Sequence, residues 1–395
     1  MLSIVAAFRW MVSFCALEIA VLRARSMRPP RFTEYVSSLF CGLLDLLVNT
    51  SAFVTFVSVY ALIVQRFAPI ALPVNAFTWV LAVLAHDLAY YAFHRASHQS
   101  AILWAAHEVH HQSDDYSLSV SLRQGTIATW VSWVFYAPLA LVGVSVEQFV
   151  AVHIAHQVFQ FFVHTRLVPK LGPLEWLLAT PSHHRVHHGR DEEQIDRNYG
   201  GFLIVWDRLF GTFTTETEEP RYGVPEGIQS WSPFWANVDP YRRLLAKVRA
   251  QSSAREMIRA LFGPPTTDRD VSSARPDYDA APERDVRMYS VAQATAVTIV
   301  ATIVLSPQSG LSAWVSAALI AWLLLSMASV SRMLDDRPQW RPLEIARVVA
   351  TGIAAIVAAV AGWVSVVAAG LWIAACALSL YELAREKADV DPLDV

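Results

Sequence analysis

Charge, cysteine and, over most of the chain, histidine are scarce in this sequence of 395 residues. Only 16% of the residues are charged, the net charge is −3, and no basic arm is present, so nothing in the charge argues for a nucleic-acid partner. The three cysteines, Cys15, Cys41 and Cys376, stand in separate apolar segments without metal-like spacing, which argues against a disulfide framework. All thirteen histidines lie within residues 86–188, so any imidazole chemistry belongs to that stretch.

Apolar residues are abundant and make up 54% of the chain. A soluble chain of this length would carry more charge, and apolar runs near the length that spans a bilayer recur along the sequence. The sequence therefore predicts an all-α, multi-pass integral membrane protein with about nine transmembrane helices. The expected spans are residues 1–22, 38–65, 76–94, 126–142, 146–164, 290–306, 312–331, 346–361 and 363–385.

The distribution of basic residues assigns a side of the membrane to the polar segments. Arginines follow the first apolar run and recur in the loop at 332–347, whereas the loops at 67–75, 143–146 and 307–311 contain neither lysine nor arginine. Under the positive-inside rule, nine spans place every histidine cluster on the cytoplasmic side. The expected location is the bacterial inner membrane or the endoplasmic reticulum, with the active site facing the cytoplasm.

Eight of the histidines form three clusters with helical spacing. Residues at i, i+3 and i+4 share one face of a helix, so each cluster is expected to aim its imidazoles at one point. Eight neutral imidazoles exceed the ligands that one four-coordinate zinc can use, which indicates two metals. Imidazole suits zinc, copper, iron and nickel alike, so ligand type alone does not name the metal. The clusters are His94 and His98; His107, His110 and His111; and His184, His187 and His188.

Two further side chains lie on the helical face of the first cluster, Asp87 and Tyr91. A carboxylate inside a membrane span is a candidate for function, and Asp87 is expected to orient a ligand imidazole rather than to bind metal. An ion pair of Asp87 with Arg95 or another cation is the alternative. The isolated His153 and His156 are expected to be packed or hydrogen-bonded and not to be ligands.

A histidine-rich dimetal site could hydrolyse, transport or oxidise. Catalytic zinc usually keeps three protein ligands and one open position, fewer than this sequence offers. A carboxylate-bridged di-iron bundle needs two Glu-x-x-His motifs; Glu108 precedes His111 by three residues, but Arg185 holds the matching place before His188. An all-histidine oxidative centre is favoured. A metal transporter or sensor is the alternative of another class, but it predicts histidines spread through many spans, and the last four expected spans contain none.

Several motifs resemble those of a known family. Two runs of this sequence resemble motifs of the membrane fatty acid hydroxylase/sterol desaturase superfamily. They are Asp87-Leu-Ala-Tyr-Tyr-Ala-Phe-His94-Arg-Ala-Ser-His98 and Leu103-Trp104-Ala-Ala-His107-Glu-Val-His110-His111. Three further runs resemble motifs of the alkylglycerol monooxygenase branch of this superfamily and its bacterial relatives. They are Asp115-Tyr116-Ser-Leu-Ser-Val-Ser-Leu-Arg123-Gln124, Thr180-Pro-Ser-His183-His184-Arg-Val-His187-His188-Gly-Arg190 and Ile195-Asp196-Arg-Asn198-Tyr199-Gly200-Gly201.

The resemblance implies a membrane enzyme with two iron ions, using O2 to hydroxylate a lipid alkyl chain. In the branch the attacked carbon adjoins an ether oxygen, and the product collapses to a fatty aldehyde and a glycerol derivative. A sterol or fatty acid desaturase/hydroxylase is the alternative within the superfamily. The resemblance adds His164, at the end of an expected span, as a ninth ligand. Tyr91, His183 and Asn198 are expected to support the ligands.

The electron donor stays open. Animal members of the branch use tetrahydrobiopterin and carry a glutamate directly after the second histidine, where this chain has Gln99. A neutral amide is a poorer acceptor for pterin N–H groups than a carboxylate. Gln99 therefore predicts that a reduced pterin binds weakly or that a cytochrome or ferredoxin is the external reductant.

Four regions are expected along the chain. N-terminal spans occupy residues 1–75, and a fatty acid hydroxylase-like catalytic domain occupies residues 76–235. A polar extension follows at 236–288 and includes a linker at 264–286 that is rich in proline and charge. Four spans without histidine form the last region, residues 289–395.

Overall fold

The structure is a computed structural model of the chain. The described residues hold α-helices and two short 3-10 helices; within them the only β-type pairings are isolated bridges, so the predicted all-helical class is confirmed. The structure describes residues 4–68, 72–225, 227–265, 278, 283–306 and 308–388.

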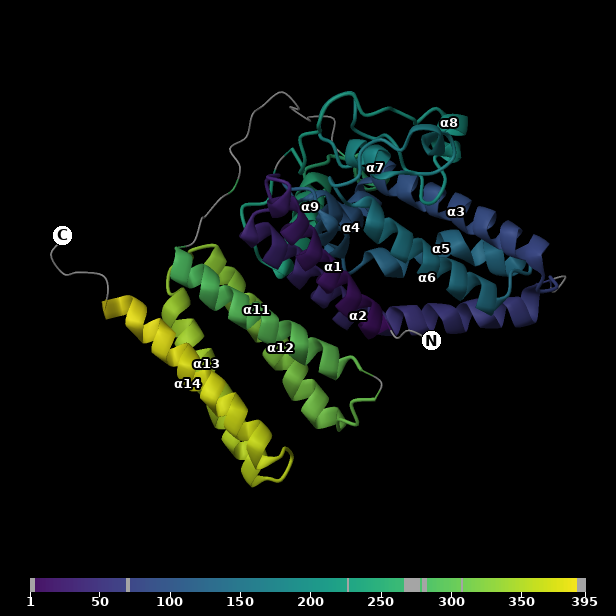
Figure 1. The fold of residues 1–395 in the computed structure, drawn as a ribbon. Helices are drawn as coiled ribbons and strands as arrows, with labels where there is room; N and C mark the ends of the chain where they lie inside the picture. Colours follow the sequence, from purple (N-terminus) through teal and green to yellow (C-terminus); the bar gives the residue numbers. More distant parts are fainter. Residues whose placement is uncertain are drawn as a thin grey trace. The chain divides into compact units, whose positions relative to one another are not determined.

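Helices occupy all nine expected spans within the described residues (Figure 1). Six of these helices, α2, α3 and α11 to α14, are long and apolar enough to cross a membrane. The expectation of nine spans is thus met in part, because α5 has only 14 residues and α6 carries three glutamines and two histidines. The bounds are α1 Ile4–Ala24, α2 Phe32–Phe67, α3 Ala76–Gln99, α5 Ala128–Leu141, α6 Val146–Val163, α11 Arg284–Val304, α12 Ala313–Leu334, α13 Trp340–Val360 and α14 Val366–Ala388.

The polar stretches between these helices fold into short helices. The segment after α3 contains α4 (Ala101–His111) and the 3-10 helix η1 (Leu118–Leu122). The third histidine cluster lies on α7 (Pro181–His187). The remaining short helices are η2 Gly172–Trp176, α8 Val205–Phe210, α9 Pro233–Arg249 and α10 Ala254–Phe262.

The chain divides into two compact units. One comprises residues 6–229 and 234–278, and the other comprises residues 279–395 with short pieces at 1–5 and 230–233. The first unit joins the expected N-terminal spans to the histidine-rich region. Most of the predicted linker at 264–286 lies outside the described residues, and its last residues begin α11.

The first unit has an aromatic and aliphatic core between its long helices. Phe56 and Tyr60 of α2 pack with Ala82 of α3, Tyr136 of α5 and Phe149 of α6. Between helices that span a membrane, such contacts stabilise through van der Waals packing rather than through the exclusion of water. This packing fixes α3 and α6, the two long helices whose ends carry histidines of the site.

Capping residues and a glycine turn set where α3 and α6 begin. Asn75 begins α3 with a capping box, since its side chain accepts from the Thr78 N–H at 3.1 Å. Ser145 begins α6 in the same way, accepting from the Gln148 N–H at 3.1 Å. The turn between α5 and α6 uses Gly143 at φ 87°, a left-handed conformation that glycine adopts without strain.

Four helices, α11 to α14, form the second unit, and they enclose a polar network. Arg347 donates to the Glu344 carboxylate at 2.5 and 2.7 Å and to the Ser326 hydroxyl at 2.9 Å. Glu344 also accepts from the hydroxyls of Tyr289 at 2.5 Å and Ser329 at 2.6 Å. The buried carboxylate and guanidinium are thereby paired, as charges inside a helix bundle must be.

Candidate dimetal site

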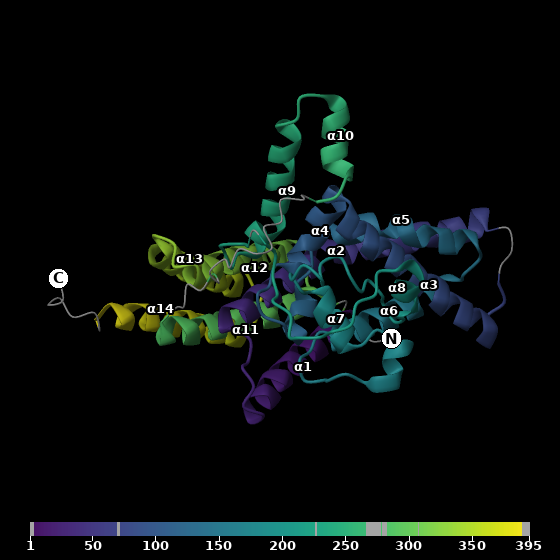
Figure 2. The ribbon, with the colours of Figure 1, turned by 90° about the horizontal axis from the view of Figure 1, so that it is seen from above.

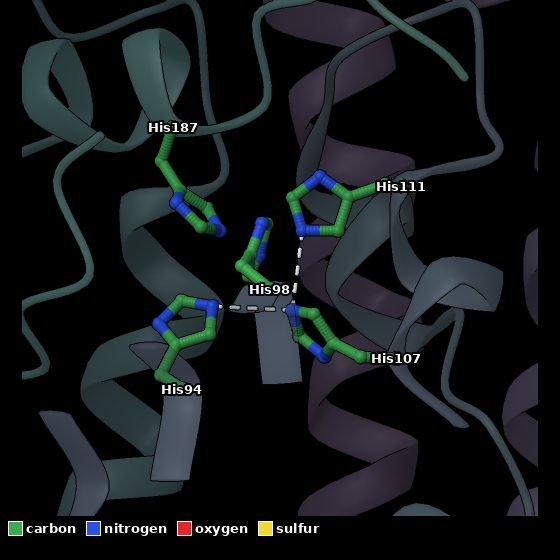
Figure 3. Close-up of side chains that lie close together, drawn as sticks. All are labelled: His94, His98, His107, His111 and His187. Atoms are coloured by element: carbon green, nitrogen blue, oxygen red, sulfur yellow. Dashed lines mark hydrogen bonds between the residues drawn. The ribbon is translucent and has the colours of Figure 1, made fainter. Parts of the chain in front are cut away.

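Nine buried histidines gather into two groups of imidazoles, and within each group the potential ligand atoms lie within 4.8 Å of one another. Figure 3 shows the larger group, with its rings pointing toward one another. All nine predicted ligands belong to one group or the other, and metal ligation itself stays a prediction. The five-histidine group is His94, His98, His107, His111 and His187; the four-histidine group is His110, His164, His184 and His188.

The two His-x-x-His-His motifs are shared between the groups. In each motif the first and last histidines join one group, whereas the middle histidine, His110 on α4 or His187 on α7, joins the other group. The expectation that each cluster aims at one point is therefore wrong for α4 and α7. The reason is geometric, since at about 100° per residue the side chain at i+4 lies about 40° to one side of that at i, and the side chain at i+3 lies about 60° to the other side. Both helices consequently lie between the two groups.

Ring nitrogens converge within each group. The Nε2 atom of His107 lies 3.1 Å from those of His94 and His111, and the Nε2 atom of His164 lies 3.1 Å from that of His110 and 3.0 Å from that of His184. Two further Nε2 atoms, on His187 and His188, are buried and have no hydrogen-bond partner. Buried polar atoms normally have partners. A metal ion in each group would provide them, so the donor set fits two transition-metal ions.

The site keeps its imidazoles neutral, the form that binds metal. Burial, reinforced by neighbouring histidines, lowers the pKa of His107, His111 and His188 well below its usual range. Burial likewise lowers the pKa of His110, to about 4. Proton competition for the ring nitrogens is therefore weak at neutral pH.

Oxygen acceptors face the other ring nitrogen, Nδ1, of five of these histidines. The distances from Nδ1 to the acceptor range from 2.6 to 3.3 Å. An Nδ1–H bond to oxygen fixes the ring and leaves Nε2 to face the metal. The pairs are His94 with Tyr199 C=O, His98 with the Asp196 carboxylate, His110 with Arg123 C=O, His164 with Gln160 C=O and His187 with Arg197 C=O.

Three of these five acceptors come from one short segment. We name residues 196–203 the acceptor strap; its Asp196, Arg197 and Tyr199 face three imidazoles of the five-histidine group. Asp196 and Asn198 have φ values of 60° and 56°, so the backbone turns sharply at alternate residues. The carbonyl groups of Arg197 and Tyr199 thereby face the site.

Side chains outside the turn hold the acceptor strap in place. Asp207 accepts from the N–H groups of Tyr199 and Gly200 at 2.8 and 2.7 Å. Asp87 accepts from the N–H groups of Phe202 and Leu203 at 2.6 and 3.0 Å. The two carboxylates therefore fix the strap from both sides.

Asp87 thus acts differently from the prediction. It bonds the strap rather than a ligand imidazole; its carboxylate lies 3.4 Å from His156, which belongs to neither group. Arg95, the predicted alternative partner, instead donates to the Tyr91 hydroxyl at 3.3 Å. Sequence reasoning did not single out Asp207, although it is the sole acidic residue in the apolar run at 199–212.

The other predicted supporting residues lie around the strap. Asn198 donates to the backbone carbonyls of His183 at 3.1 Å and Thr214 at 2.7 Å, which ties the strap to α7. The Tyr91 hydroxyl lies 2.9 Å from that of Thr212, which in turn donates to Asp207.

The remaining histidines of α3 and α6 lie apart from both groups. His86 and His153 are 3.1 Å apart through Nε2 and Nδ1, and the rings of His86 and His156 lie in contact, with centroids 5.1 Å apart. His153 also stacks on Phe149, with 5.6 Å between ring centroids. This packed and hydrogen-bonded environment matches the interpretation of His153 and His156 as structural.

A cavity of about 270 Å³ opens beside the groups. Its lining includes four of the imidazoles and, from α4, Trp104 and Glu108. Glu108 forms an ion pair with Arg243 of α9 and belongs to neither histidine group. Gln99, the predicted cofactor contact, is exposed at the end of α3 and is not among the lining residues.

Comparison with known proteins identifies relatives of this chain. The sequence profile of the fatty acid hydroxylase family matches residues 79–212. Alkylglycerol monooxygenase of Homo sapiens is 32% identical over an alignment of 361 residues, and the alignment covers 85% of this chain and 78% of the human protein. The Xenopus tropicalis enzyme of that name is 42% identical over 224 residues, 56% of this chain and half of the frog protein.

A bacterial relative is more distant. An ornithine lipid hydroxylase of Rhizobium tropici is 30% identical over 139 residues, which are 35% of this chain and 42% of that protein. No solved structure matches the chain.

Proposed function

The chain belongs to the fatty acid hydroxylase family, in its alkylglycerol monooxygenase branch, and we propose from this membership and from the two imidazole groups that it is a membrane lipid monooxygenase cleaving alkylglycerol ethers. The observation that carries the proposal is the convergence of nine buried imidazoles beside a cavity. A sterol or fatty acid desaturase/hydroxylase is not favoured, because the relatives that match most of the chain are alkylglycerol monooxygenases.

The proposed metals are two iron ions, one in each group. Bound there, they would supply activation of O2 and hydroxylation of a lipid C–H bond. The five histidines with fixed Nδ1 atoms would present Nε2 to the metals, and the acceptor strap holds three of those rings. The nine histidines are the proposed ligands; Asp87, Asp207 and Asn198 position the strap.

The proposed substrate is an ether lipid of the membrane. Hydroxylation of the carbon beside the ether oxygen gives a hemiacetal, which collapses to a fatty aldehyde and a glycerol derivative. The cavity reaches both groups through His98, His111, His187 and His188, and its α4 wall contributes alanines and Trp104. The alkyl chain of the substrate would pack against this apolar wall. The polar end of the substrate would bind near the ion pair of Glu108.

We further propose that all nine expected spans cross the membrane and that the groups face the cytoplasm. The arginine-free loops at 67–75, 143–146 and 307–311 support this orientation. The helices α1, α5 and α6 then cross in contact with protein, which accommodates their polar residues. A reductant dissolved in the cytoplasm would reach the site.

The proposed external reductant is a reduced pterin, with a cytochrome or ferredoxin as the alternative. The exposed position of Gln99 and its neutral amide favour weak pterin binding. The test measures how turnover of the purified protein depends on added reduced pterin, with Gln99→Glu alongside. Tight, saturable pterin dependence of the wild type would show that Gln99 does not impede binding.

The function is tested with purified, iron-loaded protein in lipid nanodiscs. With a reduced pterin added as the external reductant, we expect an alkylglycerol to yield a fatty aldehyde with O2 consumption, and a sterol or a free fatty acid to yield no product. Lipid analysis of cells with and without the protein should show alkylglycerols accumulating when it is absent. Changed sterol or acyl species would instead support the alternative, and exchangeable zinc without O2 consumption would support a transporter or sensor.

A further inference from the structure

The helical hairpin α9–α10 presents large apolar side chains outward. On α9, Trp235, Val238 and Leu245 are exposed, and their spacing places them on one face of the helix. On α10, Ile258 and Phe262 are 61% and 60% exposed and share a face at i and i+4. We name these five residues the hairpin apolar face. Exposed apolar patches of this kind mark interaction surfaces.

The opposite side of the hairpin is fixed to the first unit. Ala260 of α10 is buried, and the carbonyl of Gly263 accepts from the Ala101 N–H at 2.8 Å, which joins the end of α10 to the start of α4. Ser253 caps α10, because its hydroxyl accepts from the Glu256 N–H at 3.3 Å. The hairpin apolar face is therefore the outer side of an ordered element.

Basic residues accompany the hairpin apolar face. Residues 233–265 contain six lysines and arginines and two acidic residues, a net charge of +4. Arg242 and Arg249 continue the exposed face of α9, and the Arg242 guanidinium lies 5.4 Å from the centre of the Trp235 ring. Long cationic side chains above an apolar surface are typical of helices that lie in the headgroup layer of anionic membranes.

We propose that the hairpin apolar face lies in the headgroup layer of the membrane that the long helices cross. Charge selects this occupant, because the basic residues complement anionic lipid headgroups. Figure 2 shows the hairpin standing out from its unit and running across the direction of α3. An element that crosses the direction of a spanning helix runs parallel to the membrane plane, as a helix in the headgroup layer does.

The same helix borders the cavity. The opposite face of α9, with Pro240, Arg243, Leu244 and Lys247, lines the cavity beside the histidine groups. The headgroup layer would therefore adjoin the cavity across a single helix. This inference goes beyond the proposed function and does not require it, since it concerns where the hairpin lies and not what reaction the site performs.

The experiment places a fluorescent label on the hairpin in full-length protein reconstituted in phosphatidylcholine nanodiscs with or without phosphatidylglycerol. The label is attached at Ile258→Cys or, as the matched control on another side of α10, at Glu256→Cys. Cys376 is replaced by serine, and the native Cys15 and Cys41 are buried. Quenching is measured with a lipid carrying a nitroxide near its headgroup and with aqueous iodide.

We expect the nitroxide lipid to quench the label at 258 several-fold more than the label at 256, and iodide to show the reverse order. Phosphatidylglycerol should increase lipid quenching at 258, and the double variant Arg255→Glu/Arg259→Glu should reduce it. Equal quenching of both labels by iodide would show that position 258 faces water, and it would overturn the proposal. Protection of the label at 258 from both quenchers would overturn it in favour of a protein partner or a second copy of the chain.

Discussion

Replacement of Asp207 by asparagine tests whether the acceptor strap positions the five-histidine group. The Asp207 carboxylate accepts from the N–H groups of Tyr199 and Gly200 at 2.8 and 2.7 Å. It also accepts from the Thr212 hydroxyl at 2.7 Å. An asparagine offers one carbonyl oxygen and an NH2 group that cannot accept, so one backbone donor loses its acceptor. The Tyr199 carbonyl is then less firmly held against His94.

The magnitude follows from the loss of charge and of one bond. Hydrogen bonds to a charged group contribute about 1.5–3 kcal/mol each, and neutral ones about 1 kcal/mol. The attachment of the strap at Asp207 should therefore weaken by about 2–4 kcal/mol. Loss of the groups that orient metal-binding imidazoles lowers metal affinity by roughly 10–100-fold. This loss should fall on the five-histidine group, because Arg123 and Gln160, outside the strap, orient the other two fixed rings.

The assay counts metal per chain by mass spectrometry after dialysis against a graded series of chelator concentrations. We expect the wild type to retain two iron ions and Asp207→Asn to fall toward one at chelator concentrations that the wild type tolerates. Asp191→Asn is the matched control, since Asp191 bonds Arg221 in the same loop region at 2.6 Å without touching the strap. Retention of both metals by Asp207→Asn would refute the role of the strap, and equal loss of both metals would refute its selectivity.

Three further predictions follow from the same geometry. Gly201→Ala should lower metal content and turnover about ten-fold or more, because a Cβ atom there would lie 2.1 Å from His156 Nε2. Gly370→Ala, with open space around it, is the control. Unchanged metal content and turnover in Gly201→Ala would contradict this packing. Arg347→Ala should destabilise the second unit by about 3–5 kcal/mol, since it leaves the buried Glu344 without its cationic partner. The melting temperature in detergent measures this loss, and Arg287→Ala, at an exposed position, should leave it unchanged. Equal melting temperatures of the two variants would show that the Arg347–Glu344 pair is dispensable. Alanine at any one of eight histidines should abolish turnover, while His153→Ala and His156→Ala should retain substantial turnover; full activity in two of the eight would contradict the assignment. The eight are His94, His98, His107, His110, His111, His184, His187 and His188.

Much of the fold was predictable because its signals are local. Apolar runs of bilayer length predict helices irrespective of their neighbours, and each of the nine expected spans is helical. The α9–α10 hairpin was less accessible to sequence reasoning. Its segment is polar on average and was expected to be an extension, yet its apolar residues recur at helical spacing, and that periodicity could have revealed it.

The histidine motifs by themselves predicted that imidazoles converge, because i, i+3 and i+4 spacing brings side chains together on any helix, and their number predicted two metals. Only the tertiary structure decided how the nine imidazoles divide into five and four. That division depends on how α4 packs against α3 and how α7 packs against α6 in the folded chain. The acceptor strap also required the tertiary structure, because backbone carbonyl and N–H groups are the same in every sequence. Residues 94 and 199 are 105 positions apart, and only folding brings that imidazole to that carbonyl.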